Sequence, residues 1–307
     1  MSIRRWSKIF ALGDTHTDGL FSNPISVTEK VDGSQFNFGV HPEHGLMFLT
    51  KGSTVHLGDN NKLFAPAVQY VHSVESRLKE GYTYHGETLS GPRQNTLVYD
   101  HPPTNHIALY GVTKPDGSQV SSHDELSLIA MFLGIDVVPE FFHGVIDPQE
   151  IDKKLAEWLD RESYLGKEKI EGVVLKNYHQ ERFIGGVLVP LIQAKYVSER
   201  FKERHKVAWP DNNKSPLVKI GEIVRTEARW MKAIQKLKES GEYVGAPKDI
   251  GGLMKNLHID IEEEDKEHIK EQLWSAFSKD IKRAATRGFP EWYKEWLVKE
   301  QMERASG

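Results

Sequence analysis

The sequence predicts an α+β chain, in which a domain of mixed strands and helices over residues 1–210 precedes a small all-helical domain over residues 211–307. Short segments rich in β-branched or aromatic residues, bounded by Gly, Pro, Asn or His, dominate the first domain. After residues 209–213 the pattern changes, and apolar residues recur at three- and four-residue spacings. With 307 residues, of which 38% are hydrophobic, the chain can bury one large or two modest cores.

The first domain is expected to alternate strands with three helices. Strands are predicted at residues 34–40, 46–50, 96–99, 107–112, 172–175 and 188–196. Helices are predicted at residues 64–79, 122–132 and 152–160. The second of these helices begins with a capping pattern at Ser122, and the third follows a turn at Asp147 and Pro148.

The second domain is expected to contain helices only, at residues 220–239, 249–257, 264–286 and 290–300. Its tryptophans are predicted to form a core. Its basic residues form either a solvated helix face or a surface that contacts the phosphates of a nucleic-acid backbone. These residues are Arg225, Arg229, Lys232, Lys236, Lys238, Lys279, Lys282, Arg283 and Arg287. The short alternating strands of an OB-fold barrel are missing from this part of the sequence.

Composition excludes several classes of protein. No apolar run approaches the ~20 residues that a membrane span needs, and no apolar stretch follows the two N-terminal arginines, so neither a membrane protein nor a signal peptide is expected. The absence of cysteine excludes disulfides, zinc–cysteine sites and thiol catalysis, and favours the cytoplasm as the location. The net charge of −4 argues weakly against nucleic-acid binding, although a local basic groove is compatible with it.

The candidate nucleophile is Lys30, in the segment Glu29-Lys30-Val31-Asp32-Gly33-Ser34 between two predicted strands. A lysine with its ordinary pKa of ~10.4 is a poor nucleophile, but nearby cations or burial can favour the neutral amine. Gly33 would allow the backbone to approach a nucleotide closely. Taken alone, this pattern is also that of a surface turn.

Further candidate residues follow in order on later predicted strands. Glu87 supplies a carboxylate, and Tyr110 supplies an aromatic ring. Glu171 and Lys176 flank the apolar run of one strand, and Lys195 lies on another.

This series resembles the motifs of the covalent nucleotidyltransferases, and most closely those of the phage-type, nick-sealing RNA ligases. Lys30 with Asp32 and Gly33 resembles their first motif, and Lys51 stands where a basic residue, usually arginine, is found. The later motifs are matched by Glu87, Tyr110, Glu171 with Lys176, and Lys195. The resemblance covers roughly residues 25–205 and implies a nucleotidyltransferase (adenylation) domain of antiparallel sheets with flanking helices.

The resemblance implies an ATP-dependent RNA ligase that forms a lysyl-AMP intermediate on Lys30. It implies a nucleotide site that includes Glu29, Lys30, Asp32 and Gly33, with Mg²⁺ or Mn²⁺ held by Glu171. The cations Lys51, Lys176 and Lys195 would stabilise phosphate charge and lower the Lys30 pKa. Glu87 would hydrogen-bond the ribose, and Tyr110 would stack on adenine.

The implied partner is RNA with 5′-phosphate and 3′-hydroxyl ends, a nicked duplex being one such substrate. No membrane and no obligate protein partner are evident from the sequence. The missing OB pattern favours RNA over a DNA ligase or a GTP-using capping enzyme, which remain alternatives. A non-catalytic RNA-binding protein is disfavoured because Lys30, Glu87, Glu171 and Lys195 are all present.

The sequence departs from the family's motifs at two positions. Gln193 stands where the fifth motif usually has a first basic residue, so that only Lys195 remains. Lys51 in place of arginine loses bidentate phosphate recognition. Adenylylation of Lys30 is therefore better supported than the sealing reaction that follows it.

An apolar strand that ends in Asp14-Thr15-His16 offers an alternative of another class. Metallophosphoesterases begin in this way, because an aspartate and a histidine two residues apart can share one metal of a pair. The segments 58–60 and 104–106 only partly match the next two motifs, and no Gly-His-x-His follows. A two-metal site needs the full set of ligands, so we expect Asp14 and His16 to form a polar turn instead.

Overall fold

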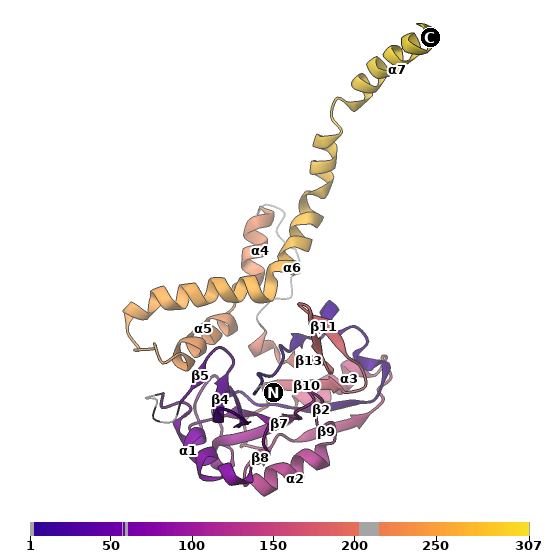
Figure 1. Ribbon diagram of the computed structural model, residues 1–307. Coiled ribbons are helices and arrows are strands. Elements are labelled where there is room, and N and C mark those ends of the chain that lie inside the picture. The colour runs from indigo at the N-terminus through magenta and orange to yellow at the C-terminus, as the bar shows by residue number, and fades with distance from the viewer. Residues whose placement is uncertain (1–2, 57, 59–60, 203–214, 307) are drawn as a thin grey trace. The chain divides into compact units, whose positions relative to one another are not determined.

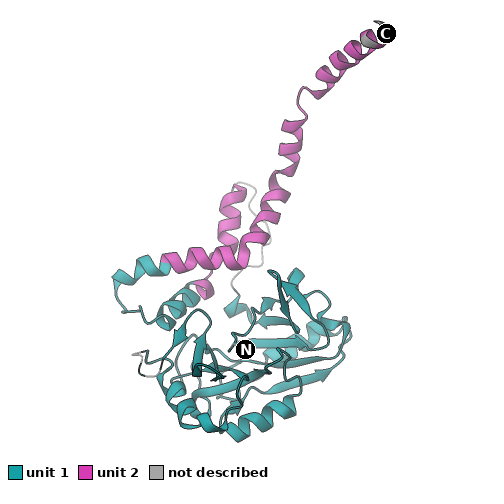
Figure 2. Ribbon diagram, in the orientation of Figure 1, with its two compact units in different colours: residues 1–202, 230–253 teal, residues 203–229, 254–307 magenta. Residues whose placement is uncertain are grey.

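The computed structural model describes residues 3–56, 58, 61–202 and 215–306. The chain divides into two compact units, coloured in Figure 2. Unit 1 comprises Met1–Lys202 and Trp230–Leu253, and unit 2 comprises Glu203–Arg229 and Met254–Gly307. The boundary expected near Pro210 lies outside the described residues, and the division at that position stays a prediction.

Unit 1 contains a five-stranded sheet that carries Lys30. Its strand order is β1 (Phe10–Ala11), β13 (Ile192–Val197), β10 (Gly172–Asn177), β2 (Ile25–Lys30) and β9 (Glu140–Gly144). Only the β1–β13 pair is parallel. Strands β11 (Arg182–Ile184) and β12 (Val187–Val189) form a separate hairpin. The expected strand at residues 188–196 is therefore two strands, because Pro190 interrupts it and cannot donate to a ladder.

A six-stranded sheet follows directly after Lys30 along the chain. Its order is β5 (Thr54–Val55), β4 (Gly45–Thr50), β3 (Ser34–His41), β6 (Thr83–Thr88), β7 (Ile107–Thr113) and β8 (Asp136–Val137). All neighbours are antiparallel except β7 and β8. Strand β2 thus belongs to one sheet and β3 to the other, with only three residues between them.

Helices cover the outer face of each sheet, as the labels in Figure 1 show. Helices α1 (Ala65–Ser73) and α2 (His123–Leu133) bury apolar residues such as Val68 and Leu133 against Phe36 and Phe38 of β3. Helix α3 (Ile151–Leu159) places Leu155 and Trp158 against the apolar side of β2, β10 and β13. Because these helices cover the apolar face of each sheet, the opposite, more polar face of each sheet is available for a functional site.

The predicted α+β class with antiparallel sheets is confirmed, and two local predictions in unit 1 are wrong. Residues 96–99 form no strand. The first helix ends at Ser73, and a short 3-10 helix at Glu75–Arg77 follows it. The capping prediction is confirmed, since the Ser122 hydroxyl accepts a hydrogen bond from the Glu125 amide at 3.3 Å.

The C-terminal region is helical throughout the described residues 215–306, apart from its turns. It contains α4 (Pro216–Val224), α5 (Glu227–Glu239), α6 (Ile250–Ala285) and α7 (Phe289–Ser306). The expected helix at 220–239 is broken at Arg225 and Thr226. The two helices expected at 249–257 and 264–286 are one continuous helix, α6.

Unit 2 corrects two expectations about its side chains. Trp274, Trp292 and Trp296 form no core, since between 42% and 59% of each is exposed. Arg229 belongs to no phosphate-binding surface, because it is buried and pairs with Asp260 at 2.5 Å and with Asp265.

None of the helices in the described part of the chain has the length and apolar character needed to cross a membrane.

Candidate active site

The five-stranded sheet presents three of the predicted lysines on one face. Lys30 pairs with Gly172, Val174 pairs with Lys195, and Lys176 pairs with Gln193. Paired residues point to the same side of a sheet, and alternate residues of a strand share a face. The side chains of Lys30, Lys176 and Lys195 therefore lie on the inner face, while intervening residues such as Val27 and Leu175 enter the core under α3.

Lys30 is held by a carboxylate. Its Nζ donates a hydrogen bond to Glu171 Oε2 at 2.5 Å, and the two side chains are 25% and 10% exposed. Burial alone would lower the Lys30 pKa, but the charges of Glu171, Glu87 and Asp32 outweigh it and raise the pKa above its ordinary value. The expectation that neighbouring cations lower this pKa is therefore wrong for the protein without nucleotide, because the charges that act on Lys30 are those of carboxylates.

The carboxylates around Lys30 have raised pKa values. Burial raises the pKa of Glu171 to about 7, against the opposing charge of Lys30, and Asp32 raises it further. Burial likewise raises the pKa of Glu87, on β6, to about 8, with added repulsion from Glu171 and Glu239. Carboxylates with raised pKa values are typical of sites that bind cations or move protons.

Asp32 and Gly33 shape the turn after Lys30. Asp32 Oδ2 accepts the amide hydrogens of Thr96 and Leu97, each at 2.8 Å, so the carboxylate fixes the neighbouring loop. A Cβ on Gly33 would lie 2.6 Å from Glu87 Cγ and 2.8 Å from the Thr88 carbonyl oxygen. Only glycine permits this approach, which brings the ends of β2 and β6 together.

Glu29 lies on the opposite side of β2 from Lys30. The Ser163 hydroxyl donates to Glu29 Oε1 at 2.5 Å, and the Tyr164 amide donates to Oε2 at 3.3 Å. Burial raises the pKa of Glu29 to about 7 in spite of these hydrogen bonds. The structure therefore shows Glu29 holding the 163–164 loop, and its predicted nucleotide contact stays a prediction.

Lys176 and Tyr110 connect the two sheets. Lys176 Nζ donates to the backbone oxygen of Tyr110 at 2.6 Å and lies over the rings of Trp6 and Tyr110, 5.2 and 5.5 Å from their centroids. Burial lowers the Lys176 pKa to about 7, with Glu140 opposing the shift. The Tyr110 ring packs edge-on against Trp6, and its hydroxyl accepts a hydrogen bond from Gln35 at 3.2 Å.

Gln193 has a structural use that the sequence did not indicate. Its Oε1 accepts the Trp6 indole hydrogen at 2.9 Å, and its Nε2 donates to the Ser7 hydroxyl at 2.8 Å. The position where the family usually has a basic residue therefore anchors the N-terminal segment beside Lys176. No local pattern around Trp6 predicts this contact, because the two residues are far apart in the sequence.

The remaining two predicted cations are not fully buried. Lys195 is half-buried on β13, and its charge lowers the Glu171 pKa. Lys51 is exposed, directly after β4, and its charge acts on Glu239 at the end of α5. Glu239 is a site-proximal residue that sequence reasoning missed.

The predicted residues for the alternative phosphoesterase site are used in local structure. Asp14 Oδ1 accepts the His16 amide hydrogen and contacts His16 Nδ1 at 2.7 Å, so the pair caps a 3-10 helix. Asn105 donates to the Gly134 carbonyl oxygen at 2.7 Å. Asp59 and Asn60, of the second partial motif, lie outside the described residues.

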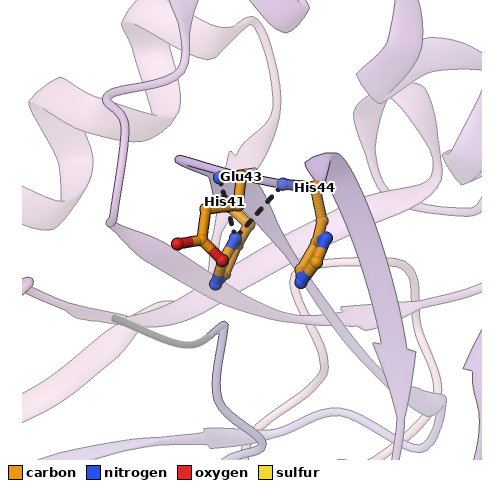
Figure 3. Close-up of side chains that lie close together, drawn as sticks. All are labelled: His41, Glu43 and His44. Atoms are coloured by element: carbon orange, nitrogen blue, oxygen red, sulfur yellow. Dashed lines mark hydrogen bonds between the residues drawn. The ribbon is translucent and has the colours of Figure 1, made fainter.

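Within the residues that the structure describes, one group of side chains has ligand atoms close enough to share a metal, namely His41, Glu43 and His44 (Figure 3). It lies on the turn between β3 and β4. His41 Nδ1 accepts the amide hydrogens of Glu43 and His44 at 3.1 and 3.2 Å, and the two imidazole rings are stacked 4.6 Å apart. These contacts explain the cluster as a capped hairpin turn.

A family model described as RNA ligase matches residues 23–197. No curated protein matches the chain. A Naegleria gruberi RNA ligase mutant solved with ATP and Mn is similar at 13% identity and a TM-score of 0.45, over 64% of this chain and 56% of that chain. A putative ATP-dependent DNA ligase from Aquifex aeolicus is similar at 18% identity and a TM-score of 0.44, over 94% and 68%.

The chain thus spans little more than half the length of the Naegleria ligase that it matches. The family match, by contrast, covers more than half of the present chain and includes Lys30, Glu87, Glu171 and Lys195. On that match, the chain belongs to the RNA ligase family.

Proposed function

We propose that this protein is an ATP-dependent RNA ligase that joins 5′-phosphate and 3′-hydroxyl RNA ends through AMP linked to Lys30. The observation that carries the proposal is the position of the Lys30 amine, on an inner sheet face with Lys195 and Lys176 and 2.5 Å from Glu171. A nucleophile that faces both carboxylates and cations suits attack on a phosphate.

In the first step Lys30 must lose a proton, because an ammonium group has no free electron pair. The carboxylates around it hold that proton in the protein without nucleotide. Once Lys30 has released the proton to water, Nζ attacks the α-phosphorus of ATP. An N–P bond forms, the P–O bond to the β-phosphate breaks, and pyrophosphate leaves with the bonding electrons.

The residues present fit a divalent metal ion. The negative charges of Glu171 and Asp32 raise the pKa of Glu87, and that of Asp32 raises the pKa of Glu171; a cation would relieve this repulsion, and carboxylate oxygens are the ligands that Mg²⁺ and Mn²⁺ accept. Glu171 would hold the ion. When bound, it would supply positive charge that weakens the hold of Glu171 on the Lys30 proton and offsets charge on the phosphate oxygens.

Three other residues are proposed to bind the nucleotide. Tyr110 lies beside an apolar cluster that includes Val31 and Ala108, which suits a stacked base. Glu87 lies across the Gly33 turn from Lys30 and would accept hydrogen bonds from the ribose. Lys51, which is exposed, would contact a phosphate as a point charge.

The two later steps move the AMP group and then release it. An oxygen of the RNA 5′-phosphate attacks the phosphorus on Lys30, the N–P bond breaks, and the amine regains a proton. The 3′-hydroxyl then gives up its proton to water and its oxygen attacks the 5′-phosphorus of the RNA; a phosphodiester forms, the P–O bond to AMP breaks, and AMP leaves with the bonding electrons. Gln193 supplies no charge for these steps, so Lys195 is the proposed cation from β13.

The test is transfer of label from ATP or GTP, labelled on the α-phosphate, to protein that mass spectrometry shows to be free of bound AMP. Wild-type protein with Mg²⁺ or Mn²⁺ should gain acid-labile, alkali-stable label from ATP. Lys30→Ala should gain none, while Lys167→Ala, a matched change at an exposed lysine, should label normally. Absence of label from both nucleotides, or label retained in Lys30→Ala, would contradict the proposal.

The polymer is tested separately, by sealing of nicked duplexes whose broken strand is RNA or DNA. We expect sealing of a strand with RNA at the nick and release of one AMP per joint. Sealing of DNA alone would favour the DNA ligase alternative, and label from GTP alone would favour the capping alternative.

A further inference from the structure

The N-terminal segment of unit 1 contacts both sheets. Arg5 Nε donates to the carbonyl oxygen of Thr50, on the six-stranded sheet, at 2.8 Å. The Trp6 amide donates to Asn37 Oδ1, on the same sheet, at 3.3 Å. The Trp6 indole Nε1 donates to Gln193 of the five-stranded sheet at 2.9 Å. Trp6 is buried, with 6% of its surface exposed, and therefore joins the two sheets from within.

The indole of Trp6 packs against the ring that is proposed to stack on adenine. Its centroid lies 5.4 Å from that of Tyr110, with 79° between the two ring planes, which is an edge-to-face contact. The residue after Tyr110 on β7 is Gly111, and a Cβ there would lie 2.5 Å from Cζ3 of the indole. The absence of a side chain at position 111 therefore makes room for Trp6 beside Tyr110.

A β-bulge leaves the direction of the Tyr110 side chain to its contacts. On β6 the register passes directly from His85 to Gly86, whose partners on β7 lie on either side of Tyr110. The extra residue of a bulge departs from the regular alternation of the strand, so the ladder constrains its side chain less. Two contacts supply the constraint instead, the edge of the Trp6 ring and the hydrogen bond from Gln35 to the Tyr110 hydroxyl.

The ammonium group of Lys176 lies over the same indole. Its Nζ is 5.2 Å from the centroid of Trp6 and donates to the backbone oxygen of Tyr110 at 2.6 Å. The Lys176 side chain is buried, with 2% exposed. A cation is attracted by the negative face of an aromatic ring, and more strongly where water is excluded. The indole thus contacts two residues of the candidate site at once.

His85 supports the indole in one protonation state. Asn37 Oδ1 can only accept, so His85 Nδ1, at 2.7 Å, carries the hydrogen and Nε2 accepts from the Thr113 hydroxyl at 2.7 Å. Burial lowers the pKa of His85 to about 3, and the charge of Lys176 lowers it further, so the ring is neutral at neutral pH. The ring packs edge-on against Trp6 at 4.9 Å, and the support of the indole therefore does not change near neutral pH.

We infer that Trp6 is a positioning residue of the nucleotide site, whose indole fixes the Tyr110 ring for the base and the Lys176 ammonium beside it. This inference rests on the proposed function, because it takes Tyr110 to stack on adenine. Rings and charges that are held in place before binding lose less freedom when the ligand arrives, which increases affinity. Trp6 precedes the region 23–197 that the family model matches, so the site extends beyond the family's motifs.

Two substitutions at Trp6 separate the ring from its hydrogen bond. Trp6→Phe keeps an aromatic ring beside Tyr110 and Lys176. It loses only the donor to Gln193, whereas Trp6→Leu loses the donor and the ring. Trp158→Leu is the matched control, because Trp158 is as deeply buried, at 2% exposed, but packs under α3 on the opposite face of the five-stranded sheet.

The experiment measures Lys30 adenylylation at a series of ATP concentrations, under conditions in which circular dichroism shows each variant to be folded. We expect Trp6→Leu to raise the ATP concentration for half-maximal labelling by about tenfold, because an edge-to-face contact and a cation–π contact are lost. Trp6→Phe should raise it by only about twofold, because a ring remains. Trp158→Leu should lower the urea concentration for half unfolding and leave the ATP requirement unchanged.

Two results of this experiment would overturn the inference. An equal ATP requirement in Trp6→Leu and Trp158→Leu would mean that any buried tryptophan has the same influence on labelling. An equal requirement in Trp6→Phe and Trp6→Leu would mean that the hydrogen bond to Gln193, and not the ring, matters.

A double-mutant cycle tests whether Trp6 acts through Tyr110. Tyr110→Leu alone should raise the ATP requirement. In that background Trp6→Leu should have less than half of the effect it has alone, since the ring that it positions is gone. Equal effects of Trp6→Leu in both backgrounds would contradict the assignment of Tyr110.

Fluorine NMR gives a readout independent of covalent labelling. In protein that contains 5-fluorotryptophan, the Trp6 and Trp158 resonances are assigned by their absence from Trp6→Phe and Trp158→Leu. An α,β-methylene analogue of ATP, which cannot transfer AMP, should shift the Trp6 resonance and leave that of Trp158 in place.

The same wild-type protein distinguishes failure of this inference from failure of the proposed function. If ATP labels Lys30 and the analogue inhibits the labelling, an unshifted Trp6 resonance contradicts this inference alone. Wild type that never labels contradicts the proposed function as well.

Discussion

Gln193 lies directly opposite Lys176 in the register of β10 and β13, and both side chains contact Trp6. The indole donates to Gln193, while the Lys176 ammonium lies over its ring. A second basic residue at position 193 would place two cations side by side in a buried region. Glutamine in place of the family's basic residue at position 193 therefore suits its neighbours, because Trp6 needs a hydrogen-bond acceptor and Lys176 already supplies a cation.

Restoring the usual basic residue should consequently harm the protein. Gln193→Lys removes the acceptor for Trp6 and buries a second charge beside Lys176, so we expect a loss of about 2–4 kcal/mol in the free energy of unfolding and no gain in nick sealing. Urea unfolding measures the first and a sealing assay the second. Gln149→Lys, at an exposed position, is the control. A variant as stable as this control and faster in sealing would refute the account.

The Lys30–Glu171 contact predicts a change in the pH dependence of adenylylation. The carboxylate raises the Lys30 pKa, so its removal in Glu171→Gln should lower that pKa and increase the neutral amine at a given pH. We expect the midpoint of the pH–rate profile to move to lower pH. The maximal rate should fall by about 100-fold, because the proposed metal ligand is lost. Single-turnover labelling measures both quantities, with Glu162→Gln as an exposed control. A midpoint that stays in place or rises would contradict this reading.

Gly33→Ala tests the close approach of the two sheets. The new Cβ would lie 2.8 Å from the Thr88 carbonyl oxygen, which belongs to a strand and cannot rotate away. We expect a loss of about 1–3 kcal/mol in stability, measured by urea unfolding. Gly52→Ala is matched to it, because nothing lies within 4 Å of a Cβ there. Equal stability of the two variants would show that the turn adapts.

The buried Glu29 carboxyl predicts a stability that falls as pH rises. Its pKa is raised from 4.5 to about 7 in the folded protein, so the folded state binds more protons than the unfolded state over this interval. Its contribution is complete below the unfolded pKa of 4.5 and is lost as pH rises through about 7, with an upper limit of roughly 3 kcal/mol.

Glu29→Gln removes this titration, although it also loses the hydrogen bond from the Tyr164 amide. Relative to wild type, the variant should therefore gain about 1–3 kcal/mol between roughly pH 5 and pH 8. Urea unfolding across this range measures the gain, and Glu162→Gln should show none. A difference from wild type that is independent of pH would be inconsistent with the raised pKa.

The buried ion pairs of unit 2 predict a large effect of Arg229→Met. The change leaves Asp260 and Asp265 buried without their arginine, which typically costs about 3–5 kcal/mol. Faster amide hydrogen exchange over residues 254–285 would reveal this loss of stability. Arg283→Met is the control and should have little effect, because Arg283 forms an exposed ion pair with Asp280. Changing both aspartates to asparagine in the Arg229→Met background should restore part of the protection. Failure to do so would show that lost packing, and not unpaired charge, is the cause.

The strands and helices that could be predicted from the sequence are those in which apolar residues alternate or recur at regular spacings. In β10, apolar residues at alternate positions enter the core and leave Lys176 on the other face. Motif order then identified Lys30, Glu87 and Glu171, which the structure brings together around one amine. These features depend on local spacing, which a single sequence contains.

Features that depend on distant contacts were not predictable. Residues 96–99 have the composition of a strand, but Asp32 takes the amide hydrogens of Thr96 and Leu97 that a strand would need. Two helices were predicted where the structure has the single long helix α6, because the charged middle of α6 lacks an apolar stripe. In the structure that middle is buried through Asp260 and Asp265, which pair with Arg229. The end of α5 reaches the turn after Lys30 through hydrogen bonds between Gln235 and Gly33 and between Asn61 and Glu239, whose partners are far apart in the sequence.

The three-residue connection between β2 and β3 has a consequence for the range of substrates. Lys30 ends a strand of one sheet and Ser34 begins a strand of the other, so the chain itself limits how far the two inner faces can separate at that point. The reactive amine therefore lies at the point where the separation of the two inner faces is most restricted.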